Sequence, residues 1–220
     1  MDFPQNIANI KSVTFGTGFV SSQSRYSATL PANPFAFPQS RVIAAVMMKI
    51  GDDRVAVKEE IHEGNLLQVN SKANEDSIFN YVYRRLDVIS ESMKEIIVTG
   101  DETDARFVNL VSIMKYDLLF REFMVDVYHE RVRDRSPLMD YDIMSFFERK
   151  GREDENVASW RYVTVFKLRR LYARILFEAG FIKSSSGTRE ICTPYISRDT
   201  KELLMKEGYE EYIIATLGSS

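Results

Sequence analysis

The segment 101–132 constrains the fold of this chain more than any other feature, because it has a helical pattern and is apolar on nearly every side. It reads DETDARFVNLVSIMKYDLLFREFMVDVYHERV and predicts one long helix or two joined helices. A helix that is apolar all round is buried on all sides. We therefore expect this segment to form the centre of the core, with the other helices packed around it.

The other helical segments carry their apolar residues on one face, at spacings of three and four. In the second of them we expect Val55, Val57 and Ile61 to face the core. Asp140 is the expected N-cap of the fourth helix, and Gly151 is its expected end. The expected helices cover 38–51, 52–64, 77–98, 140–151, a stretch after VASW that ends near 179, and 197–217.

After residue 180 the sequence changes character. Apolar residues at 181–182 and 190–192 flank a Ser/Gly-rich stretch, which predicts a β-hairpin with a loose turn. Helix, helix, longer helix and hairpin, in this order across 140–193, is typical of a winged helix-turn-helix. The expected fold class is mainly α, a helical bundle with helix-turn-helix or winged-helix-like modules and one short β-hairpin. The expected parts are an irregular N-terminal arm at 1–37, a helix-turn-helix-like module at 38–98, a central helical layer at 99–139, and a winged-helix-like module at 140–217 with its hairpin at 181–193.

Composition is typical of a soluble folded protein, with 45% hydrophobic and 28% charged residues in a chain of 220. The N-terminus has neither the basic head nor the apolar run of a signal peptide, and the apolar run at 42–48 is too short to cross a bilayer. The single cysteine, Cys192, excludes an intramolecular disulfide and is consistent with a reducing compartment. We expect a cytoplasmic protein that contacts no membrane and holds no metal or cofactor.

A strip of positive charge near the C-terminus contrasts with the formal net charge of the whole chain, which is −3. Lys167, Arg170 and Arg174 lie at i, i+3 and i+7, so a helix places them together beside its apolar face. Such a strip suits duplex DNA, which carries one negative charge per ~1.7 Å of axis. The opposing interpretation, which composition alone favours, is a solvated helix edge whose arginines pair with nearby acids. The full candidate DNA-binding set is Arg161, Lys167, Arg169, Arg170, Arg174, Lys183, Ser184, Ser185, Thr188 and Arg189.

A second candidate set surrounds the third expected helix. It contains Lys72, Asn74, Asn80, Arg84 and Arg85. Asparagine can read adenine in the major groove, and lysine and arginine can contact phosphates. Three acids lie among these residues and would repel phosphates, so a capped surface helix is the favoured interpretation here. In the arm, Phe35 and Phe37 are candidates for an exposed protein interface.

The sequence contains no recognisable catalytic motif. His62 and His129 lie on different expected helices, and local spacing pairs neither of them with Cys192 as base and nucleophile. There is no HExxH motif, phosphate-binding glycine-rich loop or G-x-S-x-G elbow. We expect a protein that is not an enzyme. A nuclease built from carboxylates alone stays as a third hypothesis, because spacing cannot rank 32 scattered acidic residues.

Segments spread over about 25–217 share their order and spacing with a known family, although none of them is a chemical motif. They are RYSATL, SRVIAAVMM, EEIHEGNLLQ, YVYRRLDVI, GDETDARFVNLVSIMKYDLLFREFMVDV, FFERKGREDENVASW, KLRRLYARILFEAGFI and EGYEEYIIATL. Together they resemble the BrxA family of BREX phage-resistance systems. The resemblance implies a cytoplasmic, mostly helical, non-enzymatic defence component that has helix-turn-helix-like modules and binds double-stranded DNA.

Two functional hypotheses follow. The first is a non-enzymatic accessory component of a BREX-type defence system that binds double-stranded DNA, mainly through the phosphate backbone and with little sequence specificity. The order of helices and hairpin and the family resemblance favour it. The alternative is a protein-interaction subunit that docks on other BREX proteins and does not contact DNA directly.

Overall fold

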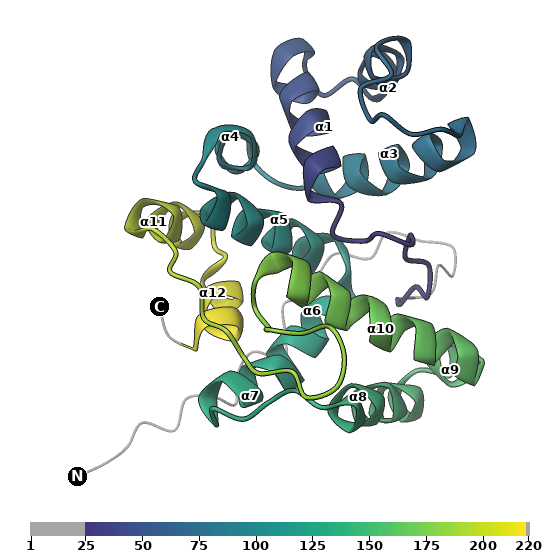
Figure 1. The fold of residues 1–220 in the computed structure, drawn as a ribbon, viewed down its shortest axis with the longest axis vertical. Coiled ribbons are helices and arrows are strands. Elements are labelled where there is room, and N and C mark those ends of the chain that lie inside the picture. The colour runs from purple at the N-terminus through teal and green to yellow at the C-terminus, as the bar shows by residue number, and fades with distance from the viewer. Residues whose placement is uncertain (1–24, 219–220) are drawn as a thin grey trace, which may run out of the picture.

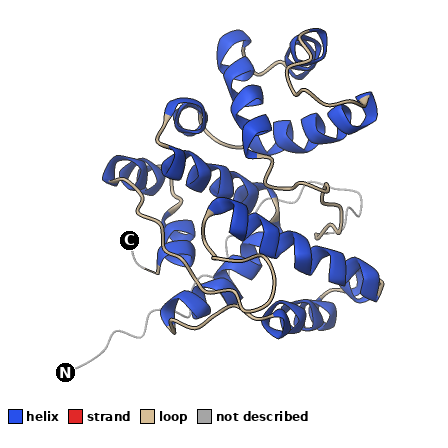
Figure 2. Cartoon of the chain, in the orientation of Figure 1, coloured by secondary structure: helices blue, strands red, loops and turns tan. Residues whose placement is uncertain are grey.

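The structure, a computed structural model, describes residues 25–218, and this part of the chain is mainly helical (Figures 1 and 2). Most of the expected N-terminal arm, residues 1–24, lies outside the described residues. The helices are α1 Phe37–Ile50, α2 Arg54–Glu63, α3 Lys72–Leu86, α4 Glu91–Thr99, α5 Glu102–Tyr116, α6 Leu118–Phe123, the π-helix η1 Met124–Tyr128, α7 His129–Arg133, α8 Asp140–Glu153, α9 Glu155–Ala158, α10 Tyr162–Ala179, α11 Arg198–Lys206 and α12 Glu210–Leu217.

The helices α1, α2 and α3 form one end of the molecule, and α8, α9 and α10 form the other (Figure 1). Between them, α4 packs against both α1 and α5, and α5 packs against α6 and α10. The C-terminal helix α12 packs against η1 and α7. One continuous apolar cluster runs through all of these layers, so the two ends share a core.

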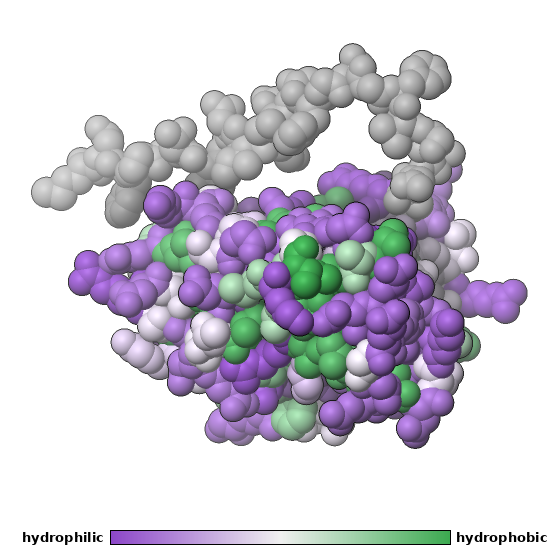
Figure 3. All heavy atoms as spheres, turned by 90° about the horizontal axis from the view of Figure 1, so that it is seen from above, coloured by the Kyte–Doolittle hydropathy of each residue, from purple (hydrophilic) through white to green (hydrophobic). Residues whose placement is uncertain are grey.

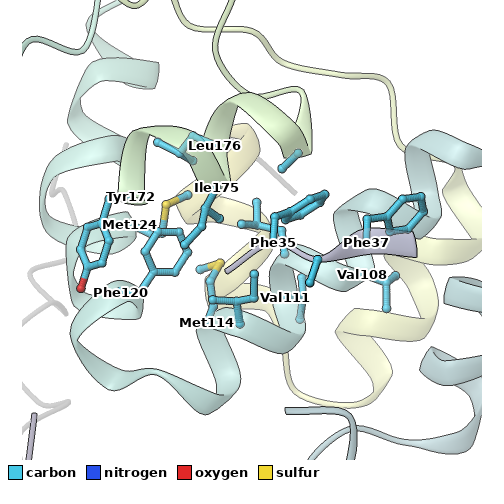
Figure 4. Packing of buried hydrophobic residues seen from close by; sticks show 14 of the residues in the cluster. Phe35, Phe37, Val108, Val111, Met114, Phe120, Met124, Tyr172, Ile175 and Leu176 are labelled. Atoms are coloured by element: carbon cyan, nitrogen blue, oxygen red, sulfur yellow. The ribbon is translucent and has the colours of Figure 1, made fainter. Parts of the chain in front are cut away.

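The buried position expected for the segment 101–132 is confirmed. In α5, Phe107, Val108, Leu110, Val111, Ile113 and Met114 are all fully buried. Figure 4 shows Val108, Val111 and Met114 among apolar side chains from the arm, α6, η1 and α10. The segment is broken at Asp117, whose side chain caps α6 by accepting a hydrogen bond of 3.0 Å from the Phe120 amide. Burial raises the pKa of the Asp117 carboxyl to about 6.

Several expected helix boundaries were wrong. The segment 77–98 is not one helix, because Ser90 accepts a hydrogen bond from the Met93 amide and starts a new helix. The segment 197–217 is divided by Gly208, which has a φ of 83° that favours glycine. Asp140 is the first helical residue of α8 rather than its cap, and α8 continues past Gly151 to Glu153.

Two further sequence expectations were wrong about burial. Val55 is 63% exposed, whereas Val57 and Ile61 are buried as expected. Phe35 and Phe37 do not form an exposed interface, because they are only 1% and 6% exposed and their rings stack at a centroid distance of 6.0 Å. Figure 4 shows both rings in the apolar core. The last part of the arm is therefore core structure.

Arg85 holds this part of the arm in place. Its guanidinium is fully buried and donates hydrogen bonds of 2.7 Å to the Pro34 and Phe35 carbonyls, and one of 3.0 Å to Asn109 Oδ1. It also donates to Ser40 Oγ. Desolvation by burial lowers the pKa of Arg85 to about 10. Arg85 was a candidate for contacting DNA, and that prediction was wrong because the side chain ties the arm to α1 and α5.

Candidate nucleic-acid interface

The cationic strip lies on α10, which begins at Tyr162 and ends at Ala179, because Gly180 follows with a φ of 86° that stops the helix. Leu168, Leu171 and Ile175 are buried against the core. Their spacing of three and four places these residues on one side of the helix, so the opposite side of α10 faces outward.

Two cations of the strip are free of acids in the described part of the chain. Lys167 and Arg170 are exposed, and no carboxylate in residues 25–218 lies within 4.0 Å of their charged atoms. Arg174 is half exposed and makes two contacts, a 2.6 Å ion pair with Glu178 and a 3.1 Å hydrogen bond to the Ala32 carbonyl. The three side chains therefore share one outward face, and only Arg174 is partly neutralised.

Two other predicted contacts are held by an acid instead. Asp140, at the start of α8, pairs with Arg169 of α10 through one carboxylate oxygen and with Arg189 through the other, the latter at 2.6 Å. Arg189 is 3% exposed and also donates to the carbonyls of Ser185 and Gly187. The sequence predicted that both arginines contact phosphates, but neither side chain is free to do so. Their role is to fasten the loop 184–188 between α8 and α10.

Of the remaining predicted residues, Arg161 is exposed at the N-cap of α10, and the others lie in or next to the loop 184–188. Lys183 pairs with Glu190, which raises the pKa of the Lys183 ammonium. Ser184 uses its hydroxyl within the loop, where it donates to the Ser186 carbonyl at 2.8 Å. Ser185 and Thr188 are exposed. The loop therefore presents hydroxyls to solvent, and its lysine is partly neutralised.

An open groove of about 1020 Å³ lies between the loop and the outward face of α10. Val163, Phe166, Lys167, Arg170 and Arg174 line it from the helix, and 185–187 line it from the loop. Ala32 of the arm borders it as well. The contributions of Val163 and Phe166 were not predicted from the sequence, because aromatic and β-branched residues in a helical run are normally core residues.

Residues 181–193 pair in an antiparallel manner over a short distance. Ile182 and Ile191 form an isolated bridge, and the Cys192 amide donates to the Phe181 carbonyl at 2.9 Å. A second isolated bridge joins Leu138, just before α8, to Arg189. The pairing of Leu138 was not predicted from the sequence, because an extended segment this short has no periodicity to detect.

The second candidate set does not form a comparable strip. Lys72, Asn74 and Arg84 are exposed on α3, whereas Arg85 is buried. Asn80 accepts a hydrogen bond of 2.5 Å from Arg54, a residue outside the predicted set. Nearby, His62 contacts Glu75 at 2.6 Å and Lys58 contacts Asp76 at 2.6 Å. The acids of this helix are thus engaged in a local network.

Neither a metal site nor a membrane span is present among the residues that the structure describes. No cluster of three or more His, Cys, Asp or Glu side chains within 25–218 has the geometry of a metal site. No helix of the described residues is long and apolar enough to span a bilayer.

The sequence and the fold both match known proteins. The chain is 35% identical to the BREX protein BrxA of Bacillus cereus (strain H3081.97), over 88% of this chain and 96% of that protein. It is 23% identical to the BREX protein BrxA of Paramagnetospirillum magneticum (strain ATCC 700264 / AMB-1), with the same coverage. A crystal structure of an uncharacterized protein from Magnetospirillum magneticum has the same fold, with a TM-score of 0.73, 23% identity, and coverage of 88% of this chain and 98% of that one. The family model of BrxA matches residues 24–208, and the chain therefore belongs to the BrxA family.

Proposed function

We propose that this protein, a BrxA family component of a BREX phage-defence system, binds double-stranded DNA and performs no chemistry on it. The outward face of α10 and the loop 184–188 make the contact, mainly to phosphates. Other BREX proteins are its further partners, and it acts in the cytoplasm.

The observation that carries this proposal is the free charge on α10. Lys167 and Arg170 have no acid within ion-pair distance in the described structure, although the whole chain has a formal net charge of −3. Exposed cations aligned on one helix face, with Arg174 next to them, attract a polyanion and release its counterions on binding.

The chain order around α10 gives further support. The helical segment of η1 and α7 is followed by the bridge residue Leu138, then α8, the four-residue helix α9, α10, and then the bridge residues Ile182 and Ile191. Apart from the short α9, a winged helix has this order of helix, strand, two helices and two strands. In that arrangement α10 is the helix that enters the major groove, and 184–188 is the wing beside it.

A salt titration of duplex binding tests the proposal. Each phosphate contact lowers the slope of log K against log[salt] by about 0.9. With three cations on the strip we expect a slope of about −3 or steeper, measured by fluorescence anisotropy on a labelled duplex. Affinity that does not depend on salt, or no binding at low salt, would contradict it. Labelled DNA incubated with Mg²⁺ or Mn²⁺ is expected to stay intact, and its cleavage would show an enzyme.

Asp140 provides a prediction in which charge and geometry have opposite effects. If charge were the only effect, removing an acid from a cationic surface would strengthen its attraction for DNA. Asp140→Ala also releases Arg169 and Arg189, and with them the loop, so we expect weaker duplex binding in the same anisotropy assay. Glu178→Gln is the matched control, because it frees only Arg174 and is expected to bind more tightly. If both variants bind more tightly, the loop is not part of the contact.

A protein-interaction role is the second candidate, and one surface favours it. Figure 3 shows apolar atoms gathered within a polar surround on the face seen from above. At the junction of α1 and α2, Met48, Ile50 and Val55 are exposed by 41%, 39% and 63%. Exposed apolar patches frequently mark protein interfaces. In this alternative the protein does not bind the duplex even at low salt, so the same titration separates the two functions.

A further inference from the structure

The outward face of α10 begins with an apolar residue rather than a cation. Val163 is 75% exposed, although valine is a residue that usually becomes buried. It lies four, seven and eleven positions before Lys167, Arg170 and Arg174. At 100° per residue these four positions fall within a narrow arc, so whatever the cations contact must also meet Val163.

The neighbouring surface of the first two turns is apolar as well. Tyr162 is 70% exposed, and its ring lies 6.1 Å from that of Phe166, which is 37% exposed. The guanidinium carbon of Arg169 lies over the Phe166 ring, 4.2 Å from the ring centroid. Contact between Tyr162, Phe166 and Arg169 holds this edge in one place beside Val163.

A valine side chain can neither donate nor accept a hydrogen bond, so it can distinguish bases only by apolar contact. The major groove offers one apolar feature, the C5-methyl group of thymine. In helix-turn-helix proteins, residues at the start of the recognition helix contact the base edges. Val163 lies in the first turn of α10.

Resting on the proposed function, we infer that Val163 reads the thymine methyl, so that the protein prefers duplexes whose major groove presents C5-methyl groups. The cations of α10 hold the helix on the phosphates, and Val163 provides a modest preference over that sequence-independent attraction. Burial of one methyl-sized group corresponds to a factor of about four in affinity.

Replacing thymine by uracil removes that methyl group and leaves every hydrogen-bonding atom in place. We therefore compare binding to an alternating d(AT) duplex and an alternating d(AU) duplex of the same length. Wherever the protein binds along them, the first duplex presents C5-methyl groups and the second presents none. The wild-type protein is expected to bind d(AT) about fourfold or more tightly. Val163→Ser is expected to bind both duplexes equally, near the wild-type affinity for d(AU).

Val55→Ser is the matched control, because Val55 is also exposed but lies on α2, and it is expected to keep the preference for thymine. Equal binding of the two duplexes by the wild-type protein would overturn this inference and leave the proposed function intact. A thymine preference that survives in Val163→Ser would overturn the assignment to this residue. No binding to either duplex at low salt would overturn the proposed function itself, and the first turn of α10 would then be a protein-binding surface.

Discussion

Replacing Lys167, Arg170 and Arg174 together with glutamate is expected to weaken duplex binding by about a hundredfold or more. Each phosphate contact that is lost lowers affinity on all sequences alike, and three acids on the same face add repulsion. Because Lys167 and Arg170 are exposed, we expect the fold to be retained. The free energy of unfolding should fall by about 1–2 kcal/mol, because Arg174→Glu removes the ion pair with Glu178 and the hydrogen bond to the Ala32 carbonyl and places a second acid four positions before Glu178. Anisotropy on two duplexes of unrelated sequence measures the effect.

The matched control for this variant carries the same change of charge on another element. Arg198, Lys201 and Lys206 lie on α11, on the other side of the molecule from α10 (Figure 1). Their triple replacement by glutamate is expected to reduce affinity by less than about threefold, through the net charge alone. Equal losses in both triple variants would mean that net charge, rather than the face of α10, determines binding.

Arg85→Ala is expected to lower the free energy of unfolding by about 3–5 kcal/mol, which is a large effect for a single substitution. The substitution leaves the Pro34 carbonyl and the amide oxygen of Asn109 buried without their donor, and each such group costs about 1–3 kcal/mol. The Phe35 carbonyl loses one of its two donors and keeps the 3.0 Å hydrogen bond from Asn109 Nδ2. At about 2–4 °C per kcal/mol, the melting temperature should fall by about 10 °C. Urea unfolding followed by circular dichroism measures the free energy directly.

Arg84→Ala provides the comparison for Arg85, because the neighbouring side chain is exposed. Its free energy of unfolding should change by less than about 0.5 kcal/mol. If the two variants are equally stable, Arg85 is not the anchor of the arm. The effect also concerns the interface, because the arm supplies the Ala32 carbonyl that Arg174 contacts.

The sequence was sufficient to predict features that depend only on the geometry of one helix. The alignment of Lys167, Arg170 and Arg174 follows from their spacing, and the burial of α5 follows from its apolar surface. The mainly helical fold followed from the same periodicity.

Features that depend on contacts between distant residues could not be predicted in this way. Asp140 pairs with Arg169 and Arg189 from 29 and 49 positions away, and no local pattern links them. Arg84 and Arg85 look alike in the sequence, and only the packing of the arm and α5 against α3 makes one exposed and the other buried. Val163 was missed for a similar reason, because an exposed valine in a helix has the sequence pattern of a core residue.

The central claim, that the outward face of α10 contacts duplex DNA, can be tested by lysine acetylation footprinting of the wild-type protein. Lys167 on α10 and Lys206 on α11 are both exposed, so both should react in the free protein. With saturating duplex at low salt, we expect acetylation of Lys167 to fall several-fold and that of Lys206 to stay unchanged, as read by mass spectrometry. Equal acetylation of Lys167 with and without bound duplex would contradict the account.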